Sequence, residues 1–191
     1  RNFELAVTDT SDQESAKVVA MPGRRLLKRG ELSHPALPFT VRVKTFYGNS
    51  SLVEKASPGY EEVKTSARAG AGLWWRELPH ETVMERRDMP SAIVELVTPQ
   101  GAFGTYLVSA FLSHPQEFTH NGRRYEIALR PERFYKPFSL HLVEFKHDKY
   151  PGTDIPKNFS SRVRLQRPDT GEDREVLIYM NNPLRYWGET Y

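Results

Sequence analysis

Short apolar runs bounded by turn-forming residues constrain the fold of this sequence most strongly. The runs are rich in β-branched and aromatic residues and are flanked by Gly, Pro, Asn or Asp. That pattern is typical of β-strands, and 14 prolines leave little room for long helices. Strands are predicted at residues 3–8, 39–46, 92–97, 103–112, 125–129, 138–145, 161–165 and 176–180. Short helices are expected at most, around residues 11–20 or 24–29.

The sequence also resembles itself. "PFTVRVKTFY" at 38–47 aligns without a gap with "PFSLHLVEFK" at 137–146, so that Phe39 matches Phe138. Residues 93–125 then resemble residues 163–191, each with a strand, a glycine turn, a second strand and an x-Pro dipeptide. An aromatic residue, a glycine and a tyrosine close both segments (Phe118, Gly122 and Tyr125; Tyr186, Gly188 and Tyr191). We predict a mostly β fold in which a duplicated antiparallel β unit forms a sandwich or a barrel-like pair of sheets.

The predicted organisation has three parts. Residues 1–36 form an N-terminal strand and connector, residues 37–130 a first β repeat, and residues 131–191 a second β repeat that is truncated at its C-terminus. The Gly/Ala-rich stretch 66–72 is a flexible insertion in the first repeat. Hairpins are predicted across residues 99–101 and 168–171. The chain starts at Arg1 without an initiator methionine, so we expect a piece of a longer protein.

The segment "KYPGTDIPKNF" at 149–159 lies between two predicted strands. Tyr150-Pro151-Gly152-Thr153 has the composition of a type II turn, because Pro fixes φ at the second position and Gly accepts a positive φ at the third. We interpret the segment as a rigid connector between strands of different sheets. A binding surface is the alternative interpretation.

Composition excludes several functions. The formal net charge of +3 argues against nucleic-acid binding, and no window approaches the length of apolar residues that a membrane span needs. The absence of cysteine excludes disulfides and thiolate metal sites from this stretch. No nucleophile elbow, phosphate-binding loop or zinc-protease motif is complete. We predict no catalytic residues and no metal site, and therefore no enzyme.

The aromatic and histidine residues leave two questions open. Trp74-Trp75 could present a surface to a flat ligand, but neighbouring strand residues face opposite sides, so at least one of them is expected in the core. The histidines lack ligand spacing, and each is interpreted as an ordinary surface or hydrogen-bonded residue. His114 and His120 flank an aromatic-rich turn, which makes them the candidate haem ligands.

The second repeat carries a more specific pattern. "FSLHLVEFKHDKYPGTDIPKNFSSRVRL" and the later "VLIYMNNPLRYWGETY" resemble the extracytoplasmic region of ResB-like proteins, which act in System II cytochrome c biogenesis. The resemblance rests on Tyr150-Pro151-Gly152, Ile155-Pro156, Phe159-Ser160 and the closing Asn-Pro-Leu-x-Tyr-x-Gly motif that ends at Tyr191. It covers the second repeat closely and the first only loosely.

The resemblance implies a protein embedded in the bacterial plasma membrane, with this domain on the extracytoplasmic side. It implies haem and apocytochrome c as the molecules handled, a ResC-type membrane partner, and a scaffolding role for the β domain. We predict a partner-binding surface formed by Tyr150, Pro151, Gly152, Asp154, Tyr186, Trp187 and Tyr191. The alternative is an extracellular β-sandwich that binds carbohydrate or protein.

Overall fold

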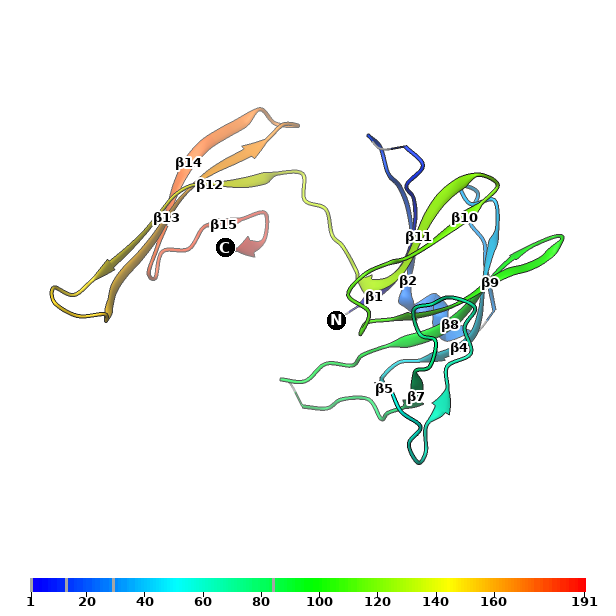
Figure 1. The fold of residues 1–191 in the computed structure, drawn as a ribbon. Coiled ribbons are helices and arrows are strands. Elements are labelled where there is room, and N and C mark those ends of the chain that lie inside the picture. Colours follow the sequence, from blue (N-terminus) through cyan, green and yellow to red (C-terminus); the bar gives the residue numbers. More distant parts are fainter. Residues whose placement is uncertain (1, 13, 29, 84) are drawn as a thin grey trace. The chain divides into compact units, whose positions relative to one another are not determined.

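A computed structural model describes residues 2–12, 14–28, 30–83 and 85–191. The chain divides into two compact units, Arg1–Arg133 and Phe134–Tyr191, which are treated separately below (Figure 1). The boundary falls close to the predicted start of the second repeat, and the predicted N-terminal segment 1–36 lies within the first unit. The prediction of a mostly β, antiparallel fold is confirmed, and the described strands form no closed barrel.

The first unit contains two four-stranded antiparallel sheets. One has the order β10-β11-β1-β2 and the other the order β3-β4-β8-β9. Alternating apolar residues put one face of each sheet into the core, as expected for strands buried on one side. The bounds are β1 Phe3–Asp9, β2 Lys17–Pro22, β3 Glu31–Leu32, β4 Thr40–Tyr47, β8 Ser91–Thr98, β9 Gly101–Ser109, β10 Gln116–His120 and β11 Arg123–Pro131.

The main core of the first unit is built from both of these sheets. Leu5 and Ile127 from one sheet and Val43, Val94 and Val108 from the other belong to a single cluster of buried side chains. The two sheets therefore bury each other's apolar faces in a sandwich-like arrangement. Segment 1–36 contributes directly to this core, because all of β1 pairs with β11.

A second, smaller cluster lies on the other side of the β8–β9 hairpin. Ile93 and Leu107 pack there with Trp75, which is 4% exposed, next to the small sheet β5-β7-β6. The prediction that at least one of the paired tryptophans is core is confirmed by Trp75. The strands of this sheet are β5 Ser50–Val53, β6 Glu61–Glu62 and β7 Trp74–Glu77.

The second unit is a three-stranded antiparallel sheet with a short hairpin. The sheet has the order β12-β13-β14, and the hairpin consists of β15 and β16 (Figure 1). Val163 pairs with Val176 across the turn at residues 168–171, which confirms the hairpin predicted there. The bounds are β12 Ser139–Lys149, β13 Pro156–Arg167, β14 Glu172–Tyr179, β15 Arg185–Tyr186 and β16 Glu189–Thr190.

The two units share details of strand pairing. In the first unit the β4–β8 register shifts between Val43 and Thr45, and in the second the β12–β13 register shifts between Leu142 and Glu144. These positions correspond in the gap-free alignment of residues 38–47 with 137–146. In the first unit the strands β4, β8 and β9 are followed by the β10–β11 hairpin, and in the second unit β12, β13 and β14 are followed by the β15–β16 hairpin. The turn of each hairpin has two consecutive residues with positive φ, Asn121-Gly122 and Trp187-Gly188.

That turn correspondence changes one part of the sequence alignment. When the two turns are aligned, His120 corresponds to Tyr186 and Phe118 corresponds to Leu184. The sequence comparison had matched Phe118 with Tyr186. Phe118 pairs with Tyr125, and Leu184 exchanges two backbone hydrogen bonds with Tyr191. Pairing around a tight turn is set by the turn residues, so the aromatic identity of Phe118 and Tyr186 was misleading.

Two local predictions differ from the structure. Residues 11–20 contain no helix in their described part, because Lys17–Pro22 forms β2 against β1, while Gly23–Lys28 forms a 3-10 helix close to the predicted 24–29. The interpretation of residues 149–159 as a connector between strands of different sheets is wrong, since β12 and β13 pair directly in one sheet. Residues 66–72 lie against β9, where Ser66 exchanges hydrogen bonds with Thr105.

No helix among the described residues is long and apolar enough to cross a membrane.

Candidate functional site

Four aromatic side chains gather at one end of the second unit, where β12 begins. Phe138 meets Tyr186, Trp187 and Tyr191 edge to face, at centroid distances of 4.9, 6.4 and 6.0 Å. These four residues are called the aromatic end below. The β15–β16 hairpin brings its three members to Phe138, and Leu165 and Leu184 are buried in the same unit. Three of the predicted partner-binding residues therefore do lie together.

Charged groups hold the phenols of the aromatic end. The Tyr186 hydroxyl donates to Glu172, and the Tyr191 hydroxyl donates to Glu189 at 2.7 Å. These hydrogen bonds to carboxylates are the main reason that the pKa of each tyrosine is raised. The same bond from Tyr186, with support from Arg174, lowers the pKa of Glu172. The tyrosines thus stay protonated hydrogen-bond donors.

A lysine also contacts the aromatic end. Lys136 forms an ion pair with Glu189 and places its ammonium 5.5 Å from the centroid of the Trp187 ring. That bond is the main cause of a lowered pKa for Glu189. Trp187 nevertheless remains 54% exposed. It offers an aromatic face at the surface of an otherwise hydrogen-bonded cluster.

The other predicted residues form the turn between β12 and β13. Thr153 donates its backbone N–H to the Tyr150 carbonyl at 3.1 Å, and Gly152 has a φ of 73°. This is the geometry of the predicted type II turn, with Pro151 at its second position. Lys149 and Asp154 close the base of the loop with an ion pair of 2.7 Å.

The structure separates the two halves of the predicted surface. The aromatic end lies where β12 starts, and the Tyr150 turn follows the last residue of β12, Lys149. At about 3.3 Å per residue, the 11 residues of β12 keep them roughly 35 Å apart. The predicted residues therefore form two clusters, and the face of the sheet lies between them.

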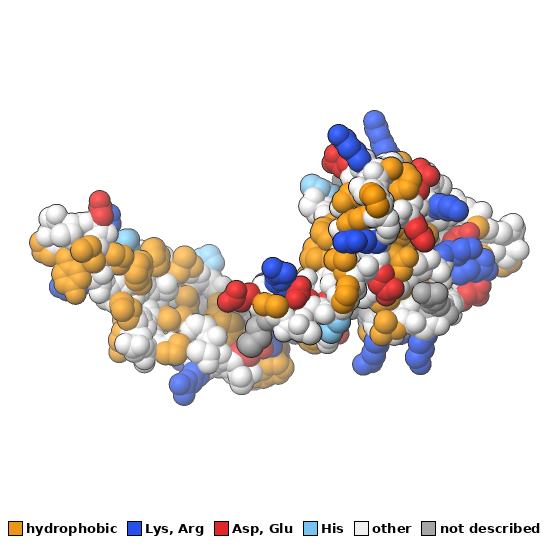
Figure 2. All heavy atoms as spheres, turned by 90° about the horizontal axis from the view of Figure 1, so that it is seen from below, with side chains coloured by type: hydrophobic (Ala, Val, Ile, Leu, Met, Phe, Trp, Pro, Cys, Tyr) orange, Lys and Arg blue, Asp and Glu red, His pale blue; other side chains and the backbone are white. Residues whose placement is uncertain are grey.

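This intervening face is apolar and uncovered toward the turn. Leu142, Phe145 and Phe159 lie on it and are 56%, 56% and 41% exposed. Phe159 stacks on His147 at a centroid distance of 4.4 Å. Figure 2 shows hydrophobic side chains at the surface of the second unit. We call Leu142, Phe145, His147 and Phe159 the open patch.

The opposite face of the same sheet is charged. Arg164 forms two hydrogen bonds of 2.6 Å with Asp173, and Arg162 lies within 3.8 Å of both Glu144 and Glu175. Residues on successive strand positions alternate between faces, so these ion pairs and the open patch point in opposite directions. A sheet with one charged and one apolar face is built to be covered on the apolar side.

Sequence reasoning did not select the open patch. The alternation Leu140-His141-Leu142 indicated an apolar face, but the same pattern is found wherever a strand covers a core. What distinguishes Leu142 is that no described residue of the second unit covers it, and exposure depends on tertiary packing. The chemistry of the patch, three apolar side chains and an imidazole, suits contact with another apolar surface.

The two candidate haem ligands are not brought together. His114 precedes β10 and His120 ends it, so an extended strand of roughly 13 Å or more separates them. His114 contacts the Ser113 hydroxyl, while the His120 ring stacks on Phe103 at 4.4 Å and meets Phe39 edge to face. The two histidines thus lie at either end of β10, and their role as haem ligands stays a prediction.

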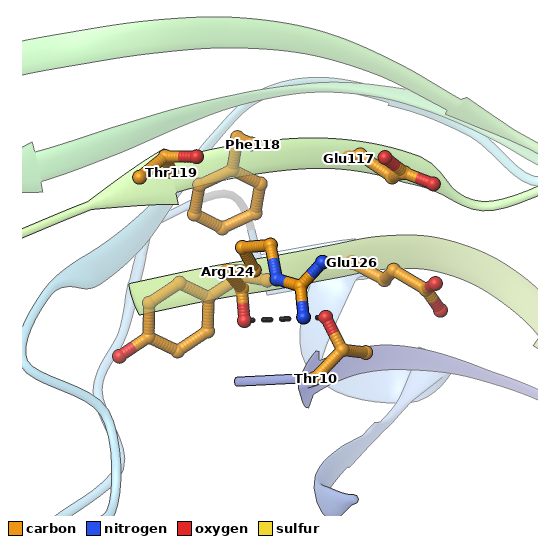
Figure 3. Close-up of a pocket in the computed structure, with 7 residues that line it drawn as sticks. Thr10, Glu117, Phe118, Thr119, Arg124 and Glu126 are labelled. Atoms are coloured by element: carbon orange, nitrogen blue, oxygen red, sulfur yellow. Dashed lines mark hydrogen bonds between the residues drawn. The ribbon is translucent and has the colours of Figure 1, made fainter. Parts of the chain in front are cut away.

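Several other surface features of the first unit offer little for chemistry. The residues that line the hollow drawn in Figure 3 include Thr10, Glu117, Arg124 and Glu126, and Thr10 donates hydrogen bonds to the Arg124 carbonyl. Alternating charges of this kind are typical of a solvated sheet face. Trp75 is buried and Trp74 half-buried, so the pair does not present two rings side by side to a flat ligand. Among the described residues no cluster of His, Asp or Glu could hold a metal ion.

Comparisons with known proteins point to one family. Residues 101–191 match the family model described as the ResB-like family, which covers β9 to β11 and the entire second unit. A 63-residue segment is 38% identical to Protein NrfI of Wolinella succinogenes. The alignment covers 33% of this chain and 7% of that protein, so the chain spans a small part of its relative.

Proposed function

Because residues 101–191 of this chain belong to the ResB-like family, we propose that the chain serves cytochrome c biogenesis as the extracytoplasmic domain of a protein anchored in the bacterial plasma membrane. In this role the domain binds and positions apocytochrome c beside a ResC-type membrane partner. It carries out no catalysis of its own. The match over the whole second unit is the observation that carries the proposal.

The aromatic end is the part of the unit best suited to hold a partner. Trp187 is exposed, yet its neighbours Tyr186 and Tyr191 are fixed by hydrogen bonds to Glu172 and Glu189. An exposed aromatic ring on a rigid support loses little conformational entropy on binding and is a frequent anchor of protein interfaces. The proposal therefore assigns partner contact to Trp187 first.

Haem is handled elsewhere in this proposal. Haem would supply the group that is joined to the apocytochrome, and the proposal assigns it no ligand on this chain, because the His120 ring is stacked on Phe103. No step of the proposed role uses haem bound to this chain. Titrating the purified chain with haem tests this, with His114→Ala and His120→Ala as comparisons. Saturable Soret absorbance that is lost in either variant would contradict a purely positioning role.

The role in biogenesis is tested in the bacterium that encodes the full-length protein. Trp187→Ser should lower the amount of covalently haem-bearing cytochrome c on a haem-stained gel. Leu177→Ser is the matched control, because Leu177 is 50% exposed and belongs to the charged face of the same unit. Equal protein levels on immunoblots are required for the comparison. Normal cytochrome c in a strain lacking residues 134–191 would overturn the proposal.

A further inference from the structure

We propose that a hollow at one end of the first unit binds a small carboxylate that has an apolar body. The Tyr125 hydroxyl and the cations Lys17 and Arg123 hold the carboxylate, and the apolar part of the ligand lies against Val19 and the loop before β4. The inference concerns the first unit and does not depend on the proposed function.

Strand pairing places a row of polar side chains on the inner face of the β10-β11-β1-β2 sheet. Asp9 pairs directly with Tyr125 on one side and with Lys17 on the other. Directly paired residues of antiparallel strands share a face, and Tyr125 belongs to the main core, so all three lie on the core side. Arg123, two residues before Tyr125 on β11, lies on the same side. The inner face of a sandwich is normally apolar, so this row needs an explanation.

A hollow of about 500 Å³ lies beside the polar row. Its apolar lining includes Val19 on β2 and Pro35, Leu37 and Pro38 in the loop before β4. The next residue of that loop, Phe39, packs edge to face on Tyr125 at a centroid distance of 5.2 Å. The hollow therefore opens directly next to the core. A concave site of this size, with apolar walls and a few polar groups, is typical of small-molecule binding.

The Tyr125 hydroxyl is the clearest sign of a ligand. Tyr125 is 3% exposed, and its hydroxyl has no hydrogen-bond partner among the described residues. Buried tyrosines usually have a partner for this group. Burial is the main cause of a raised pKa for the phenol, and the nearby charge of Asp9 adds to it. The hydroxyl therefore stays protonated and can donate a hydrogen bond into the hollow.

The second unit shows which group suits such a hydroxyl. Tyr191 follows its hairpin turn as Tyr125 does, and it donates to the carboxylate of Glu189 at 2.7 Å. Glu189 is two residues before Tyr191, and the corresponding residue of the first unit is Arg123. A cation thus replaces the carboxylate that holds the second tyrosine. A carboxylate from a ligand would pair with this cation and accept the hydrogen bond that Tyr125 has to offer.

The charges of the hollow also favour an anion. Asp9 is the carboxylate among its lining residues, and both of its oxygens are engaged. Oδ1 accepts the backbone N–H of Ser11 at 3.0 Å, and Oδ2 lies 2.6 Å from the Arg123 guanidinium. Hydrogen bonding to Ser11 is the main reason that the pKa of Asp9 is lowered, so this group stays ionised. Lys17 forms no ion pair with a described residue, which leaves a positive charge for the ligand.

The experiment titrates the complete chain with octanoate and follows its backbone amides by NMR. Octanamide is the matched control ligand, because it has the same chain length and no charge. Octanoate at up to about 20 mM should shift the amides of Asp9, Lys17 and Arg123 in a saturable way, with a Kd of about 1 mM for a ligand of about ten non-hydrogen atoms. Octanamide should bind at least about tenfold more weakly, because it cannot form the charged hydrogen bonds.

Two variants test the assigned groups. Tyr125→Phe removes only the hydroxyl and should weaken octanoate binding about fivefold. Lys17→Gln should weaken it about threefold, and Lys17→Arg should restore it. Tyr106→Phe is the control for a buried tyrosine, since Tyr106 is 8% exposed and does not line the hollow. Lys64→Gln is the control for an exposed lysine of the same unit. Both controls should leave the Kd unchanged, and amides distant from the hollow report whether each variant is folded.

Three results would overturn the inference. The first is the absence of saturable shifts at the hollow, which would leave water as the partner of the Tyr125 hydroxyl. The second is equal affinity for octanoate and octanamide, which would reduce the site to apolar contact. The third is an unchanged Kd in Lys17→Gln together with an unchanged Kd in Tyr125→Phe. If Tyr125→Phe does not fold, the comparison of Lys17→Gln with Lys17→Arg decides. None of these results involves cytochrome c, so the proposed function is tested independently.

Discussion

Phe138 meets Tyr191 edge to face with an interplanar angle of 90° and a centroid distance of 6.0 Å. In the first unit Phe39 meets Tyr125 with an angle of 84° at 5.2 Å. The two phenylalanines follow the same proline in the aligned decapeptides, and the two tyrosines follow the same type of hairpin turn. The same contact thus fixes the hairpin to the sheet in both units, with different degrees of burial.

That difference predicts unequal effects of the same substitution. Phe39 is 4% exposed and contacts four rings, so Phe39→Ala should lower the free energy of unfolding of the first unit by about 3–5 kcal/mol. Phe138 is half-buried, and Phe138→Ala should cost about 2 kcal/mol in the second unit. Urea unfolding followed by amide signals from each unit measures both. Equal losses would contradict the burial difference.

The hydrogen bond between Tyr186 and Glu172 predicts a pH dependence at both ends of the scale. The pKa of Glu172 is lowered mainly by this bond, so its contribution is present above the ordinary glutamate value of about 4.3 and is lost as the pH falls through the lowered pKa. The pKa of Tyr186 is raised mainly by the same bond. Its contribution is present below about 10 and is lost as the pH rises toward the raised value.

Tyr186→Phe tests both limbs together. The variant should flatten the stability of the second unit against pH below about 4 and above about 10, since neither group would then differ as strongly between folded and unfolded states. The pH dependence that comes from Glu189 should stay unchanged in this variant, because the pKa of Glu189 is lowered mainly by Lys136. A Tyr186→Phe profile that overlays the wild-type profile in both regions would show that the bond has no part in stability.

Gly152 is predicted to matter for conformation rather than for contact. Its φ of 73° is one that L side chains adopt with strain, although a Cβ there would meet no atom within 4 Å. Gly152→Ala should lower the stability of the second unit by about 1 kcal/mol, and Gly152→Asn by less, because asparagine tolerates this region better. Thermal unfolding measures the order. Alanine that is tolerated better than asparagine would be the contrary result.

Three buried serines of the first unit form a chain of hydroxyls. Ser91 lies 2.7 Å from both Ser50 and Ser109, and Ser50 donates to the Met89 carbonyl. Ser91→Ala should cost about 1–3 kcal/mol, because it leaves buried hydroxyls without their shared partner. By strand pairing, Ser160 of the second unit corresponds to Ser91, but it is only half-buried. Ser160→Ala should therefore change the free energy of unfolding by less than about 0.5 kcal/mol. Chemical denaturation compares the two.

The sequence was sufficient for the strands whose side chains alternate or form apolar runs. The runs around Val94, Leu107 and Val163 are strands in the structure because each has a face to bury. The short strands at Glu31 and Glu61 were missed, since two-residue pairings depend on the neighbouring strand and leave no periodicity. The β15–β16 strand pair was also missed, although the sequence shows its Trp187-Gly188 turn as an aromatic residue followed by glycine.

The candidate site was predictable in part for the same reason. Tyr186, Trp187 and Tyr191 were found because they belong to a motif, and the Tyr150 turn was found because Pro and Gly specify its dihedral angles. The separation of the aromatic end from the Tyr150 turn by the length of β12 was not predicted. The sequence analysis had assigned segment 149–159 to a connection between different sheets, which leaves the distance between the two clusters open. The open patch depends on which face lacks a cover, and alternation alone is the same for covered and uncovered faces.

The connection between the units has a consequence for handling the protein. Phe134 and Tyr135 lie where the first unit ends and the second begins, and they are 71% and 80% exposed. Chymotrypsin prefers to cleave after such side chains, and exposed connecting segments are where native proteins are first cut. Brief digestion should therefore yield two fragments divided near residue 135, each retaining its own set of sheets.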